Sequence, residues 1–125
     1  MPAATETAAI VPSTRKWSWK ARRSGGELSR VLLAVKRALA QLDPVPSYVF
    51  DEVDTGIGGA VAEAVGRMLR EVSQSRQLLC ITHLPQIACF ADLHVRVRKE
   101  DGTAWAEALD DEERVRELSR MLAGM

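Results

Sequence analysis

Three acidic residues follow a short apolar run, in the order Asp51, Glu52 and Asp54, and a glycine-rich stretch comes directly after them. Two adjacent carboxylates repel each other and lose solvation where a chain packs, so the pair needs a compensating partner. A divalent cation and a water molecule would compensate it, because one acid can hold the cation while the other polarises the water. On this stretch alone, a polar loop after a core strand is an equally good interpretation.

A single histidine, His83, follows the next apolar run of the chain, residues 77–81. A lone histidine after a strand is usually an ordinary loop residue. If residues 47–51 and 77–81 are parallel neighbours, however, His83 emerges at the same sheet edge as Asp51 and Glu52. Ligands of open α/β sheets bind at that edge, so His83 becomes a candidate contact for a phosphate or a proton.

A third segment, Ser24-Gly25-Gly26-Glu27, precedes both of these runs. Ser24 is placed as a helix N-cap, and Glu27 lies three residues on, as in a capping box. Glycines at a helix start leave backbone N–H groups open, and the helix dipole favours an anion there. The segment alone indicates only a capped helix, but its place ahead of the paired acids favours a phosphate contact.

Hydrophobic periodicity predicts the elements that must position these residues. The first four are a helix, a strand, a helix and a strand: 26–41, 47–51, 59–73 and 77–81. The last three of these form one right-handed crossover unit. A short helix, an alternating edge strand, its weak hairpin partner and a last helix follow: 84–91, 93–99, 103–109 and 110–122. We therefore expect an α/β fold with parallel strands and crossover helices, plus a C-terminal β-hairpin and helix.

Residues 1–23 show no convincing period for helix or strand, and we expect a disordered or poorly packed leader before one domain over residues 24–125. The basic, tryptophan-bearing stretch 15–23 is compatible with nucleic-acid contact, although a solvated tail fits it better.

The composition is that of an ordinary globular chain with 17 basic and 17 acidic residues, so charge gives no sign of nucleic-acid or membrane binding. No apolar run approaches the roughly 20 residues of a membrane span, and the N-terminus lacks a secretory core. Cys80 and Cys89 lie among apolar residues without metal-ligand spacing, which predicts buried free thiols. We expect a cytoplasmic protein without a membrane partner.

Taken together, the segments resemble the C-terminal half of an ABC-type ATPase head, and most closely the RecN family of SMC-like bacterial DNA repair proteins. The resemblance covers about residues 24–124. It rests on four strings: SGGELSR (24–30), FDEVDTGI (50–57), THLPQIA (82–88) and RELSRMLAG (116–124). The fold that it implies is the C-terminal lobe of a P-loop NTPase head, present in part.

The resemblance implies roles for three residues around ATP and Mg²⁺. Asp51 would be the Walker B acid that supports Mg²⁺, and Glu52 would be the general base that orients the attacking water. His83 would be the switch histidine that contacts the γ-phosphate. These roles agree with the needs of phosphoryl transfer, namely a metal, a positioned water and donors around the spreading charge.

Two further roles concern a second ATPase head. Ser24, Gly25 and Gly26 would form the signature loop, which contacts the γ-phosphate of ATP held by the opposite head. Asp54 would belong to the D-loop, at the seam between the two heads. The resemblance thus implies a second head, or a complementary P-loop lobe, as the partner, with DNA reached through the full-length assembly.

The sequence also departs from this family. It contains no G-x-x-x-x-G-K-[ST] motif, and neither a Q-loop nor a long coiled coil is found. Arg23 stands where the family has a small or apolar residue. We therefore expect a C-terminal fragment, truncated or frame-shifted, of a bacterial cytoplasmic protein for DNA double-strand break repair and recombination, nucleoid-associated when it acts on DNA. Alone it should not hydrolyse ATP. The alternative is an inactive fragment or a non-catalytic capping partner of another SMC-like head.

Overall fold

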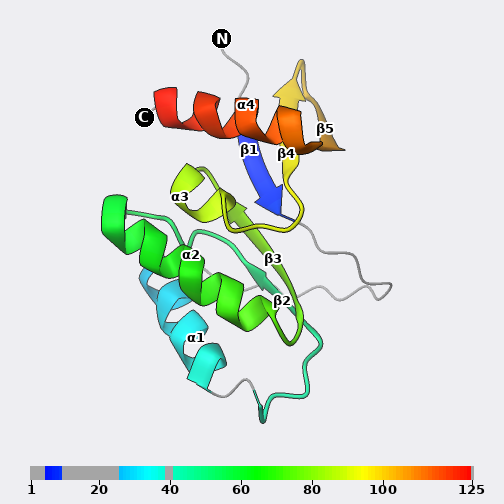
Figure 1. Ribbon diagram of the computed structural model, residues 1–125. Coiled ribbons are helices and arrows are strands. Elements are labelled where there is room, and N and C mark those ends of the chain that lie inside the picture. The colour runs from blue at the N-terminus through cyan, green and yellow to red at the C-terminus, as the bar shows by residue number, and fades with distance from the viewer. Residues whose placement is uncertain (1–4, 10–25, 39–40, 125) are drawn as a thin grey trace.

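Residues 5–9, 26–38 and 41–124 are described by the computed structural model, which forms one five-stranded sheet with helices packed on it (Figure 1). The strand order is β2-β3-β1-β4-β5. In chain order the elements are β1 (Thr5–Ala9), α1 (Gly26–Ala38), β2 (Ser47–Phe50), α2 (Gly59–Ser73), β3 (Gln77–Thr82), α3 (Pro85–Ala88), β4 (Val95–Glu100), β5 (Thr103–Ala108) and α4 (Asp111–Ala123). No helix among the described residues has the length and apolar character needed to cross a membrane.

The predicted crossover unit is confirmed. Strands β2 and β3 are parallel, with Tyr48 beside Leu78 and Phe50 beside Cys80, and α2 connects them. Alternate residues of β2 face opposite sides of the sheet, so Tyr48 and Phe50 are buried while Val49 is exposed. Helices α1 and α2 lie side by side on the buried face (Figure 1).

The main core fills the space between these helices and the parallel strands. Its members are apolar side chains from α1, α2, α3, β2, β3 and the loops after β2 and β3: Leu33, Tyr48, Phe50, Val53, Ala62, Val65, Leu69, Val72, Leu78, Cys80, Leu84 and Ile87. Gly66 lets α2 approach the segment around α3 closely, because a Cβ atom there would lie 2.5 Å from Cδ2 of Phe90. The core thus packs directly beneath the loops that follow β2 and β3.

The leader departs from expectation at residues 5–9. These residues form β1 in the middle of the sheet, antiparallel to β3 on one side and to β4 on the other. The sequence TETAA has weak strand character, but β1 supplies hydrogen bonds to two neighbouring strands, and this tertiary context outweighs local propensity. The rest of the leader lies outside the described residues.

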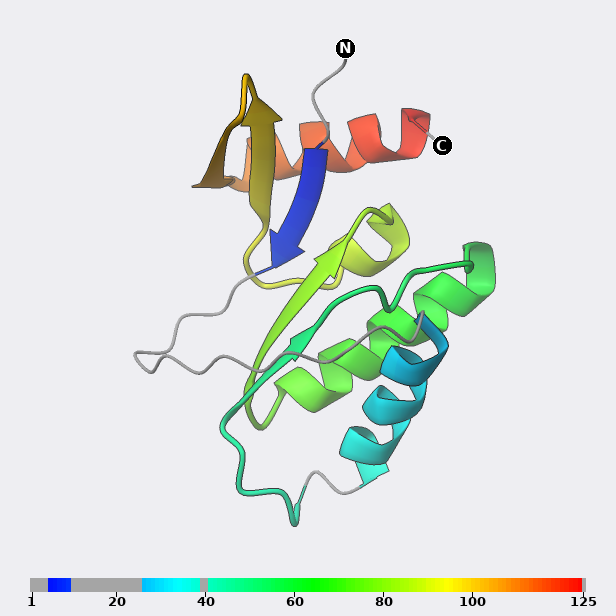
Figure 2. The ribbon, with the colours of Figure 1, turned by 180° about the vertical axis from the view of Figure 1, so that it is seen from behind.

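The C-terminal hairpin and helix are confirmed, with one correction. Strand β4 is not an edge strand, because it pairs with β1 as well as with β5. Helix α4 begins with a capping box between Asp110 and Glu113, and it crosses one face of β1 and β4 (Figure 2). Helices α1 and α3 are shorter than predicted, ending at Ala38 and Ala88.

Candidate nucleotide-site loops

The acidic loop and the histidine loop meet at one edge of the sheet. Asp51 and Glu52 directly follow β2, and His83 directly follows β3. Because these strands are parallel neighbours in register from Ser47 to Phe50, their carboxyl ends lie at the same edge. Asp51, Glu52 and His83 are all exposed there, so the predicted gathering of these residues is confirmed.

Glu52 has a backbone conformation that is unusual for a residue with a side chain. Its φ angle is +62°, in the left-handed region, and Gly56 at +73° shares that region four residues later. A non-glycine residue in this region costs about 1–3 kcal/mol, and such residues cluster at functional sites. The bend turns the chain sharply after β2, and Val53 next to it is fully buried while the Glu52 side chain is exposed.

Asp54 is buried and joins the acidic loop to the histidine loop. Its Oδ2 atom accepts hydrogen bonds from the Thr82 hydroxyl at 2.7 Å and from the backbone N–H of His83 at 2.8 Å. The same oxygen lies 2.7 Å from Nδ1 of His83. Its carboxylate therefore faces the interior of this chain. The place of Asp54 at a seam with a second head stays a prediction.

Arg30 ties helix α1 to the acidic loop. Its Nη1 atom donates to the carbonyl oxygens of Val53 at 3.2 Å and of Thr55 at 2.9 Å, the residues on either side of Asp54. Arg30 lies one helical turn after Gly26, where α1 begins. The start of α1 is thereby held near the same loop. Ser24 and Gly25, the other predicted signature residues, lie outside the described residues.

Two of these contacts escaped the sequence analysis. Arg30 and Thr82 belong to the recognised strings SGGELSR and THLPQIA, yet neither was singled out. A polar residue at the end of a buried strand, as Thr82 is, gives a usable signal, because it needs a hydrogen-bond partner at the site. Arg30 gives no such local signal, since arginine on a helix surface is common.

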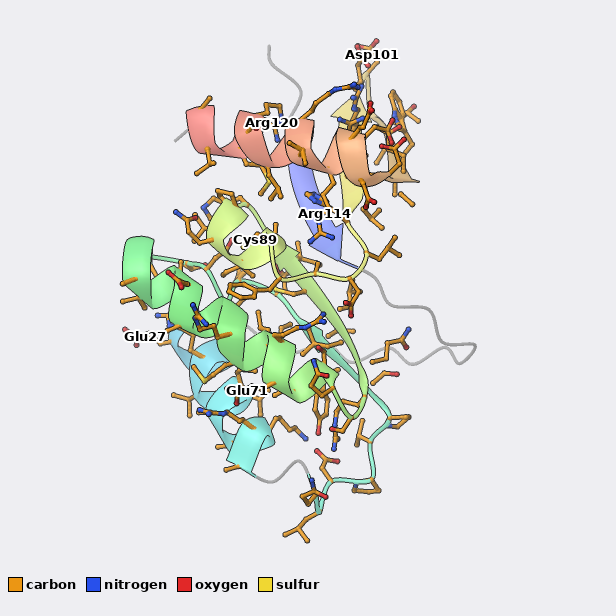
Figure 3. The ribbon with its side chains drawn as sticks, in the orientation of Figure 1. Glu27, Glu71, Cys89, Asp101, Arg114 and Arg120 are labelled. Carbon is orange, nitrogen blue, oxygen red and sulfur yellow. The ribbon has the colours of Figure 1, made fainter. Side chains whose placement is uncertain are left out.

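The two cysteines differ in their environment. Burial raises the pKa of the Cys80 thiol to about 12, and the charges of Asp54 and Asp51 nearby add to the effect. Both thiols are free, as predicted, but Cys89 is exposed rather than buried. Cys89 is the C-cap residue of α3, and its carbonyl oxygen accepts a hydrogen bond from Arg114 of α4 (Figure 3). Its apolar neighbours in the sequence did not reveal that its side chain is exposed.

The acids at the sheet edge suit a cation whose other ligands are water molecules and phosphate oxygens. Among the described residues, no group of three or more His, Cys, Asp or Glu side chains is placed to hold a metal ion. Mg²⁺ in phosphoryl-transfer sites is bound by one or two carboxylates, with phosphates and waters completing the shell. The exposed Asp51 carboxylate fits that requirement without a protein cage.

Comparison with known proteins identifies relatives in sequence. No protein family model matches the chain. It is 55% identical over 105 residues to the DNA repair protein RecN of Streptomyces coelicolor, covering 81% of this chain and 18% of that protein. It is 49% identical over 106 residues to RecN of Bacillus subtilis, covering 82% and 18%. The chain thus spans about a fifth of the length of these relatives.

Solved structures show the same likeness in fold. The Smc head domain with a coiled coil and joint from Pyrococcus yayanosii is 30% identical, with a TM-score of 0.65 over 78% of this chain and 19% of that one. A chain from a study of ATP-driven dimerization and DNA-stimulated activation of SMC ATPases is 28% identical, with a TM-score of 0.63. The likeness covers 80% of this chain and 62% of the SMC chain.

Proposed function

This chain is a RecN-like portion of an SMC-type ATPase head, and from that premise we propose that it supplies the catalytic-carboxylate half of an ATP-hydrolysing site. One observation carries the proposal. The acidic loop after β2 and the histidine loop after β3 meet at the carboxyl edge of two parallel strands, and Asp54 bonds them together. That edge is where α/β sheets bind their ligands.

The residues at this edge can divide the work of phosphoryl transfer. Asp51 would hold Mg²⁺, and the ion would neutralise charge on the phosphates of ATP. Glu52, on its bent backbone, would orient and deprotonate the attacking water. His83, whose side chain is 66% exposed, would contact the γ-phosphate. Ser24, Gly25 and Gly26 would contact the γ-phosphate of ATP on an opposing head.

The site needs a partner to grip the rest of the nucleotide. The sequence holds no G-x-x-x-x-G-K-[ST] motif, so the β-phosphate would be held by a complementary P-loop lobe or a second head. One structural neighbour comes from work on the ATP-driven dimerization and DNA-stimulated activation of SMC ATPases. Likeness to the RecN DNA repair proteins supports an assembly that acts on DNA. We propose further that this action is double-strand break repair and recombination in the bacterial cytoplasm.

An ATPase assay of the purified chain, alone and with a full-length RecN relative, tests the proposal. We expect no turnover by the chain alone and added turnover in the mixture. Glu52→Gln should abolish the added turnover, while Glu100→Gln, on the exposed end of β4, should leave it unchanged. Removing Mg²⁺ should stop the added turnover of the unsubstituted chain and of the Glu100→Gln variant. Added turnover that survives Glu52→Gln would contradict the proposed role of this residue.

The missing P-loop motif favours a second function, in which the chain caps an SMC-like head without hydrolysing ATP. Under that function the chain binds the relative and lowers, rather than raises, its ATPase rate, and Glu52→Gln changes nothing. The sign of the rate change in the same mixture separates the two functions.

A further inference from the structure

We infer that Asp54 is a positioning residue, which holds His83 by its Nδ1 atom and so presents Nε2 outward as the working nitrogen of the switch histidine. The inference deepens the proposed function, because the catalytic meaning of His83 rests on that function. It assigns Asp54 a task within its own chain, distinct from any contact with a second head.

Three polar contacts of the Asp54 carboxylate involve the same oxygen atom, Oδ2. Oδ2 of Asp54 accepts from the Thr82 hydroxyl and from the backbone N–H of His83, at 2.7 and 2.8 Å. It also lies 2.7 Å from Nδ1 of His83. The Thr82 oxygen in turn accepts from the backbone N–H of Leu84 at 3.1 Å, which fixes the hydroxyl proton toward Asp54. His83 is therefore held at two atoms, its backbone nitrogen and the ring Nδ1.

The contrast in exposure sets the direction of the ring. The Asp54 side chain is 5% exposed, whereas that of His83 is 66% exposed. A buried carboxylate is costly unless donors surround it, and the three donors here compensate Asp54. With Nδ1 against the buried oxygen, the exposed part of the ring is the part that carries Nε2.

Asp54 is itself held from the other side. Arg30 binds the carbonyl oxygens of Val53 and Thr55, so the backbone on both sides of Asp54 is anchored to α1. A positioning residue must be more rigid than the group that it positions, and these contacts meet that condition.

The arrangement has a chemical consequence for the histidine. A carboxylate beside Nδ1 favours the neutral tautomer with its proton on Nδ1, whereas a histidine without such a partner favours a proton on Nε2. In the Nδ1–H tautomer, Nε2 accepts a hydrogen bond from water. Once protonated, Nε2 donates to a phosphate oxygen, and Asp54 balances the ring charge, as the acid of a Ser-His-Asp triad does.

Nitrogen NMR of the imidazole tests the inference without nucleotide. The sample is the full chain labelled with ¹⁵N-histidine, at a concentration where sedimentation shows a monomer, with the pH raised until the ring spectra stop changing. His83→Gln assigns the His83 signals against those of His94, the other histidine. We expect mainly Nδ1–H for His83. Asp54→Leu should lower the ratio of Nδ1–H to Nε2–H by about tenfold, and Asp54→Asn by a smaller factor.

Thr82→Val is the matched control. It removes a hydroxyl that bonds to the same oxygen but leaves the carboxylate beside Nδ1, so the tautomer ratio should change by less than about twofold. If Asp54→Leu fails to fold, Asp54→Asn decides. The inference is overturned if Nε2–H dominates in the unsubstituted chain, if Asp54→Asn leaves the ratio unchanged, or if Thr82→Val lowers it as much as Asp54→Asn does.

The ATPase mixture supplies an independent second readout. If the proposed function holds, Asp54→Asn should lower the added kcat by at least about tenfold with little change in KM, since ring orientation acts on the transition state. If the mixture shows no added ATPase turnover, the proposed function fails. The tautomer ratio still reports whether Asp54 positions His83.

Discussion

At the scale of single residues, Glu52 combines the proposed general base with a strained backbone. Its positive φ is costly for any residue with a side chain, yet the bend sets its carboxylate outside while Val53 enters the core. A residue chosen for stability alone at this position would be glycine or asparagine. A glutamate at this strained position therefore supports the proposed role of the Glu52 side chain.

Glu52→Gly should therefore separate stability from activity. We expect the free energy of unfolding to rise by up to about 1 kcal/mol, because glycine adopts a positive φ without strain, while the added ATPase turnover is lost. Chemical denaturation and the mixed ATPase assay measure the two effects. Asp101→Gly is the control, since Asp101 has a φ of +48° in the turn between β4 and β5, far along the chain from the site. It should leave turnover unchanged. A fall in stability on Glu52→Gly would show that the carboxylate, not the bend, stabilises the loop.

At the scale of elements, the Arg30 side chain joins α1 to the acidic loop. Arg30→Ala should lower the free energy of unfolding by about 2 kcal/mol, because two carbonyl oxygens lose their donor. Arg37→Ala is the matched control on the same helix. Arg37 forms an exposed ion pair with Glu71 of α2, which is labelled in Figure 3. This pair should contribute less than about 1 kcal/mol. Urea unfolding of both variants checks the difference, and equal effects would contradict the special role of Arg30.

Helix α4 is held to the sheet by a buried charge. The Glu117 side chain is 1% exposed and pairs with Arg120 on its own helix and with Arg96 on β4, which also pairs with Glu107. Burial by itself would raise the pKa of Glu117, but the hydrogen bonds and charges of Arg120 and Arg96 outweigh it and lower the pKa below its ordinary value of 4.5. These three ion pairs thus connect α4, β4 and β5.

This lowered pKa makes the stability of the chain depend on pH. The carboxylate is more acidic in the folded than in the unfolded state, so its contribution is fully present above pH 4.5 and is lost as the pH falls below that value. Glu117→Gln should cost about 3 kcal/mol at pH 7 and flatten the acid-side decline. Glu112→Gln, in an exposed pair with Arg116 on the same helix, should do neither. Urea unfolding from pH 7 to pH 3 is the measurement. An unchanged pH slope in Glu117→Gln would contradict this account.

At the scale of the whole molecule, several large apolar side chains are exposed in the part of the chain that the structure describes. Helix α1 exposes Val31 and Val35, at 58% and 44%, and Val49 on β2 is 65% exposed. Strand β2 also ends the described sheet, with β3 as its one neighbour there. Such surfaces and open edges promote association between chains.

We expect the chain alone to self-associate as its concentration rises. The double substitution Val31→Lys and Val35→Lys should shift this association to at least about tenfold higher concentration, because two charges would have to lose solvation in the contact. Val115→Lys, a single exposed valine on α4, should have little effect. Sedimentation velocity over a range of concentrations tests this. Association that the double substitution leaves unchanged would place the contact elsewhere, for example on the β2 edge.

Sequence alone determined the features that depend on local pattern. The period of apolar residues predicted β2, α2 and β3. The order of these elements in the chain predicted that Asp51, Glu52 and His83 lie at one sheet edge. The acidic first turn of α4 and the Asp101-Gly102 turn are likewise local signals. The four recognised strings gave the family because they combine particular residues at particular positions, which no general propensity does.

Tertiary structure alone decided the contacts that join distant segments. The segment TETAA forms β1 because β3 and β4 supply its hydrogen-bond partners. Its pairing with β4 also places β4 inside the sheet and not at the edge. Asp54 is three residues from Asp51, yet its carboxylate points inward because Thr82 and His83, nearly thirty residues on, offer the donors. Nothing in local periodicity encodes such pairs, since their free energy depends on which groups the fold brings within hydrogen-bond distance.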